Sequence, residues 1–228
     1  MRHIIKSIPN LLTLSNLFCG CVAVTYAFSG DFITAFWLVV LAAVFDFLDG
    51  MAARLLNAHS PIGADLDSLA DMVSFGVAPS AVLFTMGVGW FGFAVALFSA
   101  LRLAKFNVDD RQTTEFIGLP VPADALFFVS VGYIVSAGAG TYLASVFSTV
   151  WFLSALVALF SLLMVSEIRM FSLKFKNFGF KDNALRYCFL ASSAVLVALL
   201  GVRAVPFVIV GYIVISMVRN FVTVTKLS

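Results

Sequence analysis

Long apolar runs follow one another along this chain, separated by short breaks that hold glycine, proline or clustered charges. A helix needs roughly 20 apolar residues to cross the hydrocarbon layer of a membrane, and glycine and proline commonly mark where such a run stops. The pattern therefore predicts an all-α membrane protein with about eight transmembrane helices. Their expected ranges are residues 11–28, 32–56, 62–86, 89–107, 120–138, 142–166, 184–201 and 204–221. Residues 1–10, which contain Pro9, are expected to form a short interfacial segment before the first span.

The composition agrees with a membrane protein. Of the 228 residues, 62% are hydrophobic and 11% are charged, whereas soluble domains have about 45–50% apolar and about 25% charged residues. Eight spans with short loops leave no room for a separate soluble domain, so residues 1–228 are expected to form one transmembrane domain. The first residues lack the cleavage pattern of a signal peptide, and the first span is expected to act as its own insertion signal. The expected surroundings are membrane lipids and not nucleic acid.

Lysine and arginine are distributed unevenly over the two sides that this arrangement creates. With eight spans and a cytoplasmic N-terminus, 13 of the 14 basic residues fall on the cytoplasmic side and Arg203 falls on the other. Cytoplasmic loops of membrane proteins carry such an excess of Lys and Arg. Seven spans would misplace one terminus, so both termini are expected to be cytoplasmic. The cytoplasmic set is Arg2, Lys6, Arg54, Arg102, Lys105, Arg111, Arg169, Lys174, Lys176, Lys181, Arg186, Arg219 and Lys226.

Charged side chains interrupt the second and third apolar runs, where ionisable groups are costly and therefore indicate function. At 100° per residue, one face of the second helix, roughly 140° wide, carries Asp46, Asp49, Gly50, Ala53 and Arg54. On the third helix, Gly63, Asp67 and Asp71 recur every four residues and form a single stripe. A tight turn near residues 57–61 would make the two helices antiparallel neighbours. Their four carboxylates are therefore expected to converge at the cytoplasmic ends of these helices.

Four carboxylates in a small volume repel one another unless cations compensate them. Oxygen ligands without a useful Cys or His favour hard divalent ions such as Mg²⁺, Mn²⁺ or Ca²⁺. Two such ions about 3.5–4 Å apart are a recurring arrangement for phosphoryl transfer. Gly50, Ala53 and Gly63 would leave room for a bulky ligand, and Arg54 would complement a phosphate. The pattern predicts a two-metal site.

The four aspartates have two other interpretations, as helix caps or solvated charges and as the ion pathway of a transporter. Single aspartates near helix ends are commonly caps or solvated charges, but this spacing of four argues against that role. Asp65 breaks the stripe and is expected to face solvent. A cation transporter would use intramembrane acids as well, yet such proteins often show paired repeats with sites at the bilayer midplane. No repeat is apparent here, and the acids cluster at one surface.

The spacing of these residues resembles a known family signature. The signature of the CDP-alcohol phosphotransferases is matched by Asp46-x2-Asp49-Gly50-x2-Ala53-Arg54-x8-Gly63-x3-Asp67-x3-Asp71. The resemblance extends over roughly residues 8–200 and implies a six-helix core followed by two C-terminal helices. Members of that family transfer a phosphatidyl or related group from a CDP-linked donor to an alcohol and release CMP. The resemblance also implies a homodimer.

Residue roles follow from the same resemblance. It implies that Asp46, Asp49 and Asp67 hold the metal ions, and that Asp71 both binds metal and acts as the general base. It also implies a CDP site, with Asn10 and Thr13 approaching the nucleotide from the first helix. The CDP-binding set is Asp49, Gly50, Ala53, Arg54, Gly63, Asn10 and Thr13.

The flanking segments 7–20, 67–79, 101–107 and 116–123 resemble the serine-transferring bacterial membrane subgroup, the phosphatidylserine synthases. The implied reaction joins CDP-diacylglycerol and L-serine to give phosphatidylserine and CMP, at the cytoplasmic face of the bacterial inner membrane. The signature itself leaves open glycerol 3-phosphate, inositol or inositol phosphate as acceptor, or an ether-lipid donor. One departure is Asp124, where the subgroup leads us to expect a small neutral residue.

Serine also needs a partner for its carboxylate. Arg102 and Lys105, at the cytoplasmic end of the fourth helix, are the candidates. An equally good interpretation of both is that they anchor the helix at the headgroups.

Overall fold

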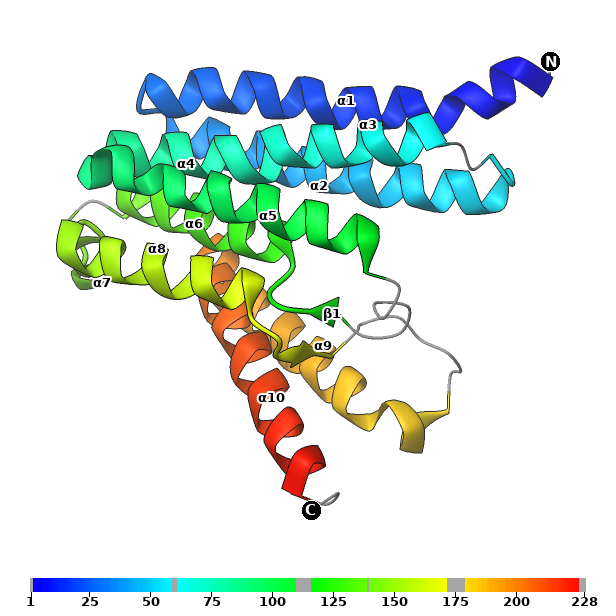
Figure 1. Ribbon diagram of the computed structural model, residues 1–228. Helices are drawn as coiled ribbons and strands as arrows, with labels where there is room; N and C mark the ends of the chain where they lie inside the picture. The colour runs from blue at the N-terminus through cyan, green and yellow to red at the C-terminus, as the bar shows by residue number, and fades with distance from the viewer. Residues whose placement is uncertain (1, 59–60, 110–115, 139, 172–178, 226–228) are drawn as a thin grey trace.

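The computed structural model describes residues 2–58, 61–109, 116–138, 140–171 and 179–225, and they are mostly helical (Figure 1). The helices are α1 (Arg2–Phe28), α2 (Phe32–Leu55), α3 (Pro61–Asp71), η1 (Met72–Val77), α4 (Ala78–Leu83), η2 (Phe84–Val88), η3 (Gly89–Phe93), α5 (Ala94–Val108), α6 (Val121–Ala137), α7 (Tyr142–Phe147), α8 (Val150–Val165), α9 (Phe180–Leu200), η4 (Gly201–Ala204) and α10 (Val205–Thr225). Two short strands, β1 (Phe116–Ile117) and β2 (Arg169–Met170), pair antiparallel. The all-α expectation is confirmed apart from this ladder.

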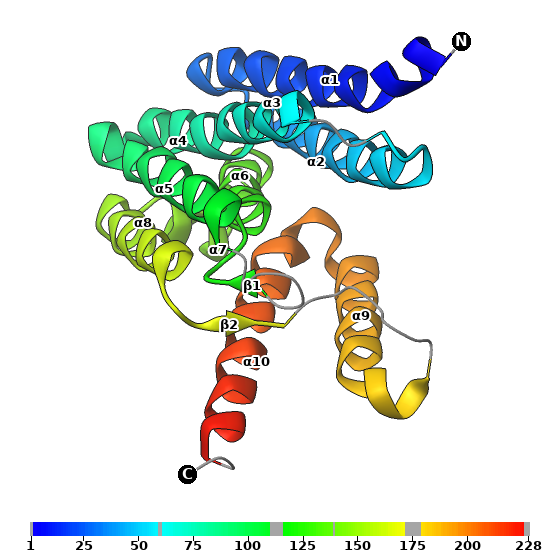
Figure 2. The same ribbon diagram turned by 45° about the vertical axis from the view of Figure 1, so that its right-hand side comes forward.

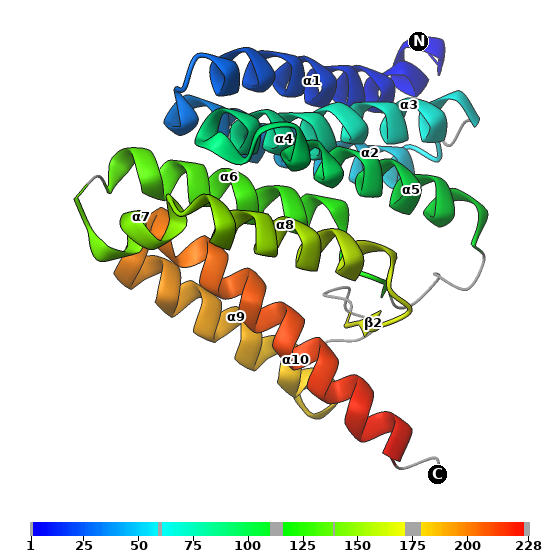
Figure 3. The same ribbon diagram turned by 60° about the vertical axis from the view of Figure 1, so that its left-hand side comes forward.

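The helices form a layered bundle. α1 packs along α2, and α2 also packs on α6, which in turn contacts α4 and α10, while α8 packs mainly on α5. Figures 1 and 3 show α9 and α10 leaving this bundle at an angle. In Figure 2 the β1–β2 ladder lies beside α10, which β2 contacts. The buried core is therefore built around α6 and its neighbours.

Each of the eight expected ranges contains helix, but several differ from the expectation in their bounds or in the type of helix. α1 begins at Arg2 and continues through Pro9, so the described residues 2–10 are continuous with the helix of the first span. The range 62–86 changes from α-helix to π-helix at Met72. The single helix expected over 142–166 is wrong, because α7 ends at Phe147 and α8 begins at Val150.

The break between α7 and α8 has a local cause. Ser148 Oγ donates to the carbonyl of Ala144 at 2.7 Å, and Thr149 Oγ1 donates to the carbonyl of Ser145 at 3.3 Å. Hydroxyl side chains that bond to nearby carbonyls compete with the helical backbone pattern. Thr149 takes an extended conformation at the position before α8, and its side chain makes no capping hydrogen bond to that helix.

Four described helical runs are long and apolar enough to cross a membrane: Ser7–Phe28, Phe32–Leu55, Ile62–Val108 and Asn183–Phe221. The third run reverses direction at Gly87 and Gly89, whose positive φ angles of 97° and 67° suit glycine. The fourth reverses at Gly201, also at positive φ. α6 and α8 are shorter apolar helices. These elements make the chain a membrane protein.

A close contact between α1 and η1 positions the polar part of the bundle. A Cβ atom on Gly20 would lie 2.3 Å from Ser74 Oγ and 2.8 Å from Ser74 Cα, so no side chain fits at position 20. η1 is a π-helical segment, a feature that is frequent at functional sites, and it begins directly after Asp71. The glycine lets α1 approach the segment that carries this aspartate.

Candidate metal and substrate site

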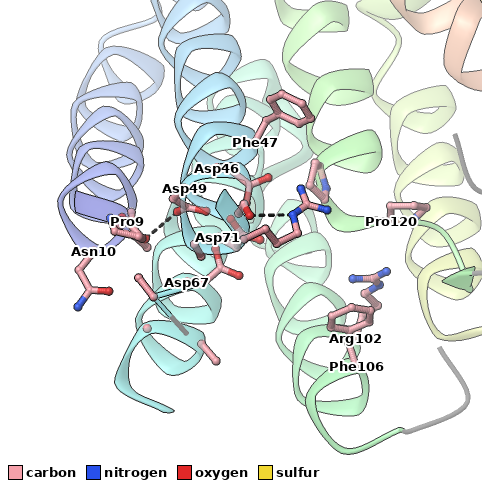
Figure 4. Close-up of a pocket in the computed structure, with 18 residues that line it drawn as sticks. Pro9, Asn10, Asp46, Phe47, Asp49, Asp67, Asp71, Arg102, Phe106 and Pro120 are labelled. Atoms are coloured by element: carbon pink, nitrogen blue, oxygen red, sulfur yellow. Dashed lines mark hydrogen bonds between the residues drawn. The ribbon is translucent and has the colours of Figure 1, made fainter. Parts of the chain in front are cut away.

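A cavity of about 500 Å³ opens between α1, α2, α3 and α5, and is closed on one side by the residues that begin α6 (Figure 4). Its lining contains every residue that the sequence proposed for the site except Lys105. Those that line it are Asn10, Thr13, Asp46, Asp49, Gly50, Ala53, Arg54, Gly63, Asp67, Asp71 and Arg102. The two helices that carry the signature are joined by a turn in which Asn57 has a positive φ of 48°. Residues 59–60 of this turn lie outside the described residues.

Three of the carboxylates form a close group. Asp46, Asp49 and Asp67 each offer an oxygen, and these atoms all lie within 4.8 Å of one another. Asp49 is buried and the other two are half-buried. Asp67 Oδ1 is buried, with no hydrogen-bond partner among the described residues. An oxygen-only group of this size and charge suits a hard divalent ion, so the three residues fit a metal site.

Asp71 lies beside this group and not within it. Its carboxylate is buried, with 8% of the residue exposed, and Asn16 Nδ2 donates to its Oδ1 at 3.1 Å. Asp71 still lines the same cavity. The four carboxylates thus share one cavity as expected, but the structure separates Asp71 from the other three.

α1 contributes hydrogen bonds to two of the carboxylates. Thr13 Oγ1 donates to Asp49 Oδ2 at 2.6 Å, and the same Thr13 hydroxyl lies 3.0 Å from the carbonyl oxygen of Pro9. Thr13 was expected near the nucleotide, and its observed contact is with a carboxylate. Asn16 was not among the expected site residues. The sequence feature that could have pointed to Asn16 is the row of Thr13, Asn16 and Gly20 on one face of an otherwise apolar helix.

The two arginines at the cavity are held differently. Arg54 Nε donates to the carbonyl of Gly50 at 2.9 Å, one turn back on its own helix, and the side chain borders the opening. Arg102 is buried, with 6% exposed, and its guanidinium carbon lies 5.1 Å from the centre of the Phe106 ring. Cation–π contacts of this kind stabilise a desolvated guanidinium. Figure 4 shows Arg102 beside Phe106.

Lys105 points away from the cavity. Its Nζ lies 2.5 Å from Glu167 Oε1 in an exposed ion pair, and such surface pairs contribute little stability. The structure therefore brings only one of the two candidate serine-carboxylate partners to the site.

Two other aspartates lie outside the cavity. Asp65 is exposed on α3, as expected. Asp124 is fully buried in the first turn of α6, and neither of its carboxylate oxygens has a hydrogen-bond partner among the described residues. A carboxylate in the first turn of a helix is favoured by the helix dipole, but burial of Asp124 in an apolar interior is costly.

The membrane-length helices define an integral membrane protein. The carboxylate group in its cavity defines a polar site that can hold a metal ion. The sequence profile of the CDP-alcohol phosphatidyltransferase family matches residues 6–164, and the chain belongs to this family. The resemblance found in the signature residues is therefore confirmed.

Curated relatives carry the name CDP-diacylglycerol–serine O-phosphatidyltransferase. A Helicobacter pylori protein (strain J99) is 45% identical over 130 residues, which cover 53% of this chain and 55% of the relative. A Mycobacterium leprae protein is 34% identical over 227 residues, 92% of this chain and 70% of the relative. A Methanocaldococcus jannaschii protein is 36% identical over 177 residues, 74% and 75% of the two chains. The chain spans about half the length of the Helicobacter relative.

Metal binding can be measured without substrate. We expect Mn²⁺ or Mg²⁺ to raise the thermal midpoint of the detergent-solubilised protein, because a ligand at 100 times its Kd stabilises the folded state by about 2.7 kcal/mol. Asp49→Asn should lose most of this shift, since it removes a charge from the three-carboxylate group. Asp65→Asn, an exposed change on α3, is the matched control and should keep it. A full shift in Asp49→Asn would exclude this group as the metal site.

Proposed function

We propose that this protein transfers the phosphatidyl group of CDP-diacylglycerol to the hydroxyl of L-serine, giving phosphatidylserine and CMP. The observation that carries the proposal is that the signature residues of the family line one cavity together with a buried arginine. The choice of serine is supported by the names of the relatives, one of which aligns with 92% of this chain. Family membership supports the CDP-linked donor.

Asp46, Asp49 and Asp67 would hold divalent metal, Mg²⁺ or Mn²⁺, with Asp71 as a further ligand if two ions bind. When bound, the metal would neutralise the diphosphate of the donor and stabilise the departing CMP. The chain leaves space for this diphosphate at Gly50, because a Cβ atom there would meet nothing within 4 Å. The donor can thus approach the backbone of α2 closely.

We assign nucleotide binding to the residues around the exposed backbone at Gly50. Ala53 and Arg54 lie one turn further along α2, and Asn10 of α1 lines the same cavity. The Arg54 side chain can exchange its bond with the Gly50 carbonyl for the diphosphate, a stronger charge-assisted partner. Gly63 and Asp49 complete the proposed CDP site.

Asp71 is the proposed general base. It takes the proton of the serine hydroxyl as that oxygen forms its bond to the phosphatidyl phosphorus. The bond from this phosphorus to the bridging oxygen breaks at the same centre, and CMP leaves with the electron pair. Burial of Asp71 among α1, α3 and η1 limits the access of water that would compete with serine.

We also propose eight crossings with both termini in the cytoplasm of a bacterial cell. The two runs with internal reversals would each cross twice, the α1 and α2 runs once, and α6 and α8 once each. The excess of basic residues on one side supports this orientation, although Arg111, Lys174, Lys176 and Lys226 lie outside the described residues. The cavity would then face the cytoplasm, where serine and CMP are soluble. A single domain and a homodimer remain proposals from the family resemblance.

The acceptor is tested by giving the purified protein CDP-diacylglycerol and Mn²⁺ or Mg²⁺ with a panel of alcohols. Serine should release CMP fastest and yield phosphatidylserine, detected by mass spectrometry. Glycerol 3-phosphate, inositol and inositol phosphate are the competing acceptors. Turnover with one of these alone would refute serine and keep the transfer reaction. No CMP release with any alcohol would refute the activity.

For the general base, Asp71→Asn should abolish serine-dependent CMP release while CDP still binds. The amide keeps the size of the side chain but cannot accept the proton, and general bases contribute about 10²–10⁴-fold to rate. Turnover and CDP binding should be measured on the same preparation. Wild-type turnover in the variant would remove Asp71 from this role.

For the serine carboxylate, we propose that Arg102 is the partner. Arg102→Gln should raise the KM for serine by about 10- to 100-fold, since a hydrogen bond to a charged group contributes about 1.5–3 kcal/mol. The KM for CDP-diacylglycerol should change much less. Lys105→Gln, three residues along α5 and outside the cavity, is the control. Equal effects of the two variants on serine would contradict the assignment.

A further inference from the structure

Asn16 connects α1 to the segment that carries Asp71 through two hydrogen bonds. Its Nδ2 donates to Asp71 Oδ1 at 3.1 Å, and its backbone carbonyl accepts a hydrogen bond from Ser74 Oγ at 3.0 Å. Asn16 is fully buried. The amide orientation follows from its neighbour, because the opposite orientation would place two acceptor oxygens together. Side chain and backbone thus hold both sides of the junction between α3 and η1.

A contact from another helix is needed to explain the orientation of the Asp71 side chain. Asp71 follows Asp67 by four residues, so the helical repeat alone directs it to the same face as the carboxylate group. It makes no side-chain hydrogen bond to the start of η1. The hydrogen bond from Asn16 draws one of its oxygens toward α1, and the close approach of Gly20 to Ser74 makes this bond reachable.

A neighbouring residue of α1 acts on a different carboxylate. Thr13, three residues before Asn16, donates to Asp49, which belongs to the group within 4.8 Å. One helix face therefore supports the carboxylate group through Thr13 and Asp71 through Asn16. We therefore expect Thr13 to affect metal binding and Asn16 to affect the transfer to the acceptor.

The presence of a buried asparagine at this position also argues for a functional role. Asn16 Oδ1 is buried and has no hydrogen-bond partner among the described residues. An unsatisfied buried acceptor destabilises a fold, and an apolar residue of similar size would pack between helices without this cost. The amide is therefore better explained by its hydrogen bond to Asp71 than by packing.

We propose that Asn16 is a positioning residue for the acceptor step. It fixes one carboxylate oxygen of Asp71 against α1, so that the other is presented to the acceptor hydroxyl in the cavity. The proposal rests on the proposed function, in which Asp71 is the general base. It assigns to Asn16 no contact with donor, acceptor or metal.

The test compares three variants of neighbouring α1 residues in the full-length protein. Asn16→Leu should lower kcat about 10- to 100-fold, with the KM for CDP-diacylglycerol within threefold of wild type. Thr13→Val should instead raise the Mn²⁺ concentration needed for half-maximal activity, with kcat recovering at saturating Mn²⁺. Ser15→Ala, whose hydroxyl bonds only to the Leu11 carbonyl on the exposed face among the described contacts, should match wild type in every measurement.

Mn²⁺ binding, measured by calorimetry without substrate, gives a readout that does not need turnover. Loss of the Asn16 bond frees an Asp71 oxygen, so Asn16→Leu should bind Mn²⁺ about threefold more tightly. The gain should vanish in Asn16→Leu/Asp71→Asn compared with Asp71→Asn, which makes a double-mutant cycle. Weaker Mn²⁺ binding, a gain that persists without Asp71, or unchanged kcat in an active protein would each overturn the proposal. An inactive wild type would refute the proposed function, and the Mn²⁺ cycle would still decide the role of Asn16.

Discussion

Mutual repulsion among carboxylates is the constraint on which the polar part of this structure depends. Asp46, Asp49 and Asp67 bring their oxygens within 4.8 Å inside a bundle whose other buried residues are mostly apolar. Such a group is stable only with cations and hydrogen-bond donors around it. The hydrogen bond that Thr13 donates to Asp49 meets part of that need. The remainder is a reason to expect divalent metal at this place.

Much of the site could be predicted because its residues lie on two helices joined by a short turn. The 3.6-residue period places Asp46 and Asp49 on one face and Asp67 and Asp71 on another, and a short connection makes those faces neighbours. The cavity lining agrees with this reasoning. What could not be predicted depends on distant partners. Asn16, which donates a hydrogen bond to Asp71, lies 55 positions before it in the sequence.

Two other differences from the sequence-based expectation have separate causes. Lys105 is drawn outward by Glu167, 62 residues away, and no local pattern indicates this pairing. The break after Phe147 arises from Ser148 and Thr149, whose hydroxyls look unremarkable within an apolar run. The run lengths and their glycine breaks, in contrast, are local properties, so the helical ranges were largely predictable. The family match ends at residue 164, so it does not include α9 and α10. These helices are nevertheless joined to the preceding chain, because Tyr212 on α10 donates a hydrogen bond to the carbonyl of Phe171, the residue after β2, at 3.0 Å.

The contact between Gly20 and Ser74 has a consequence for how such sequences can diverge. A side chain at position 20 would displace the π-helical segment and, with it, the aspartate that immediately precedes that segment. The clash includes the backbone of Ser74, so no replacement of the Ser74 side chain alone would make room at position 20. A lineage that enlarges position 20 must therefore move α1 away from η1, and with it change the geometry of the cavity.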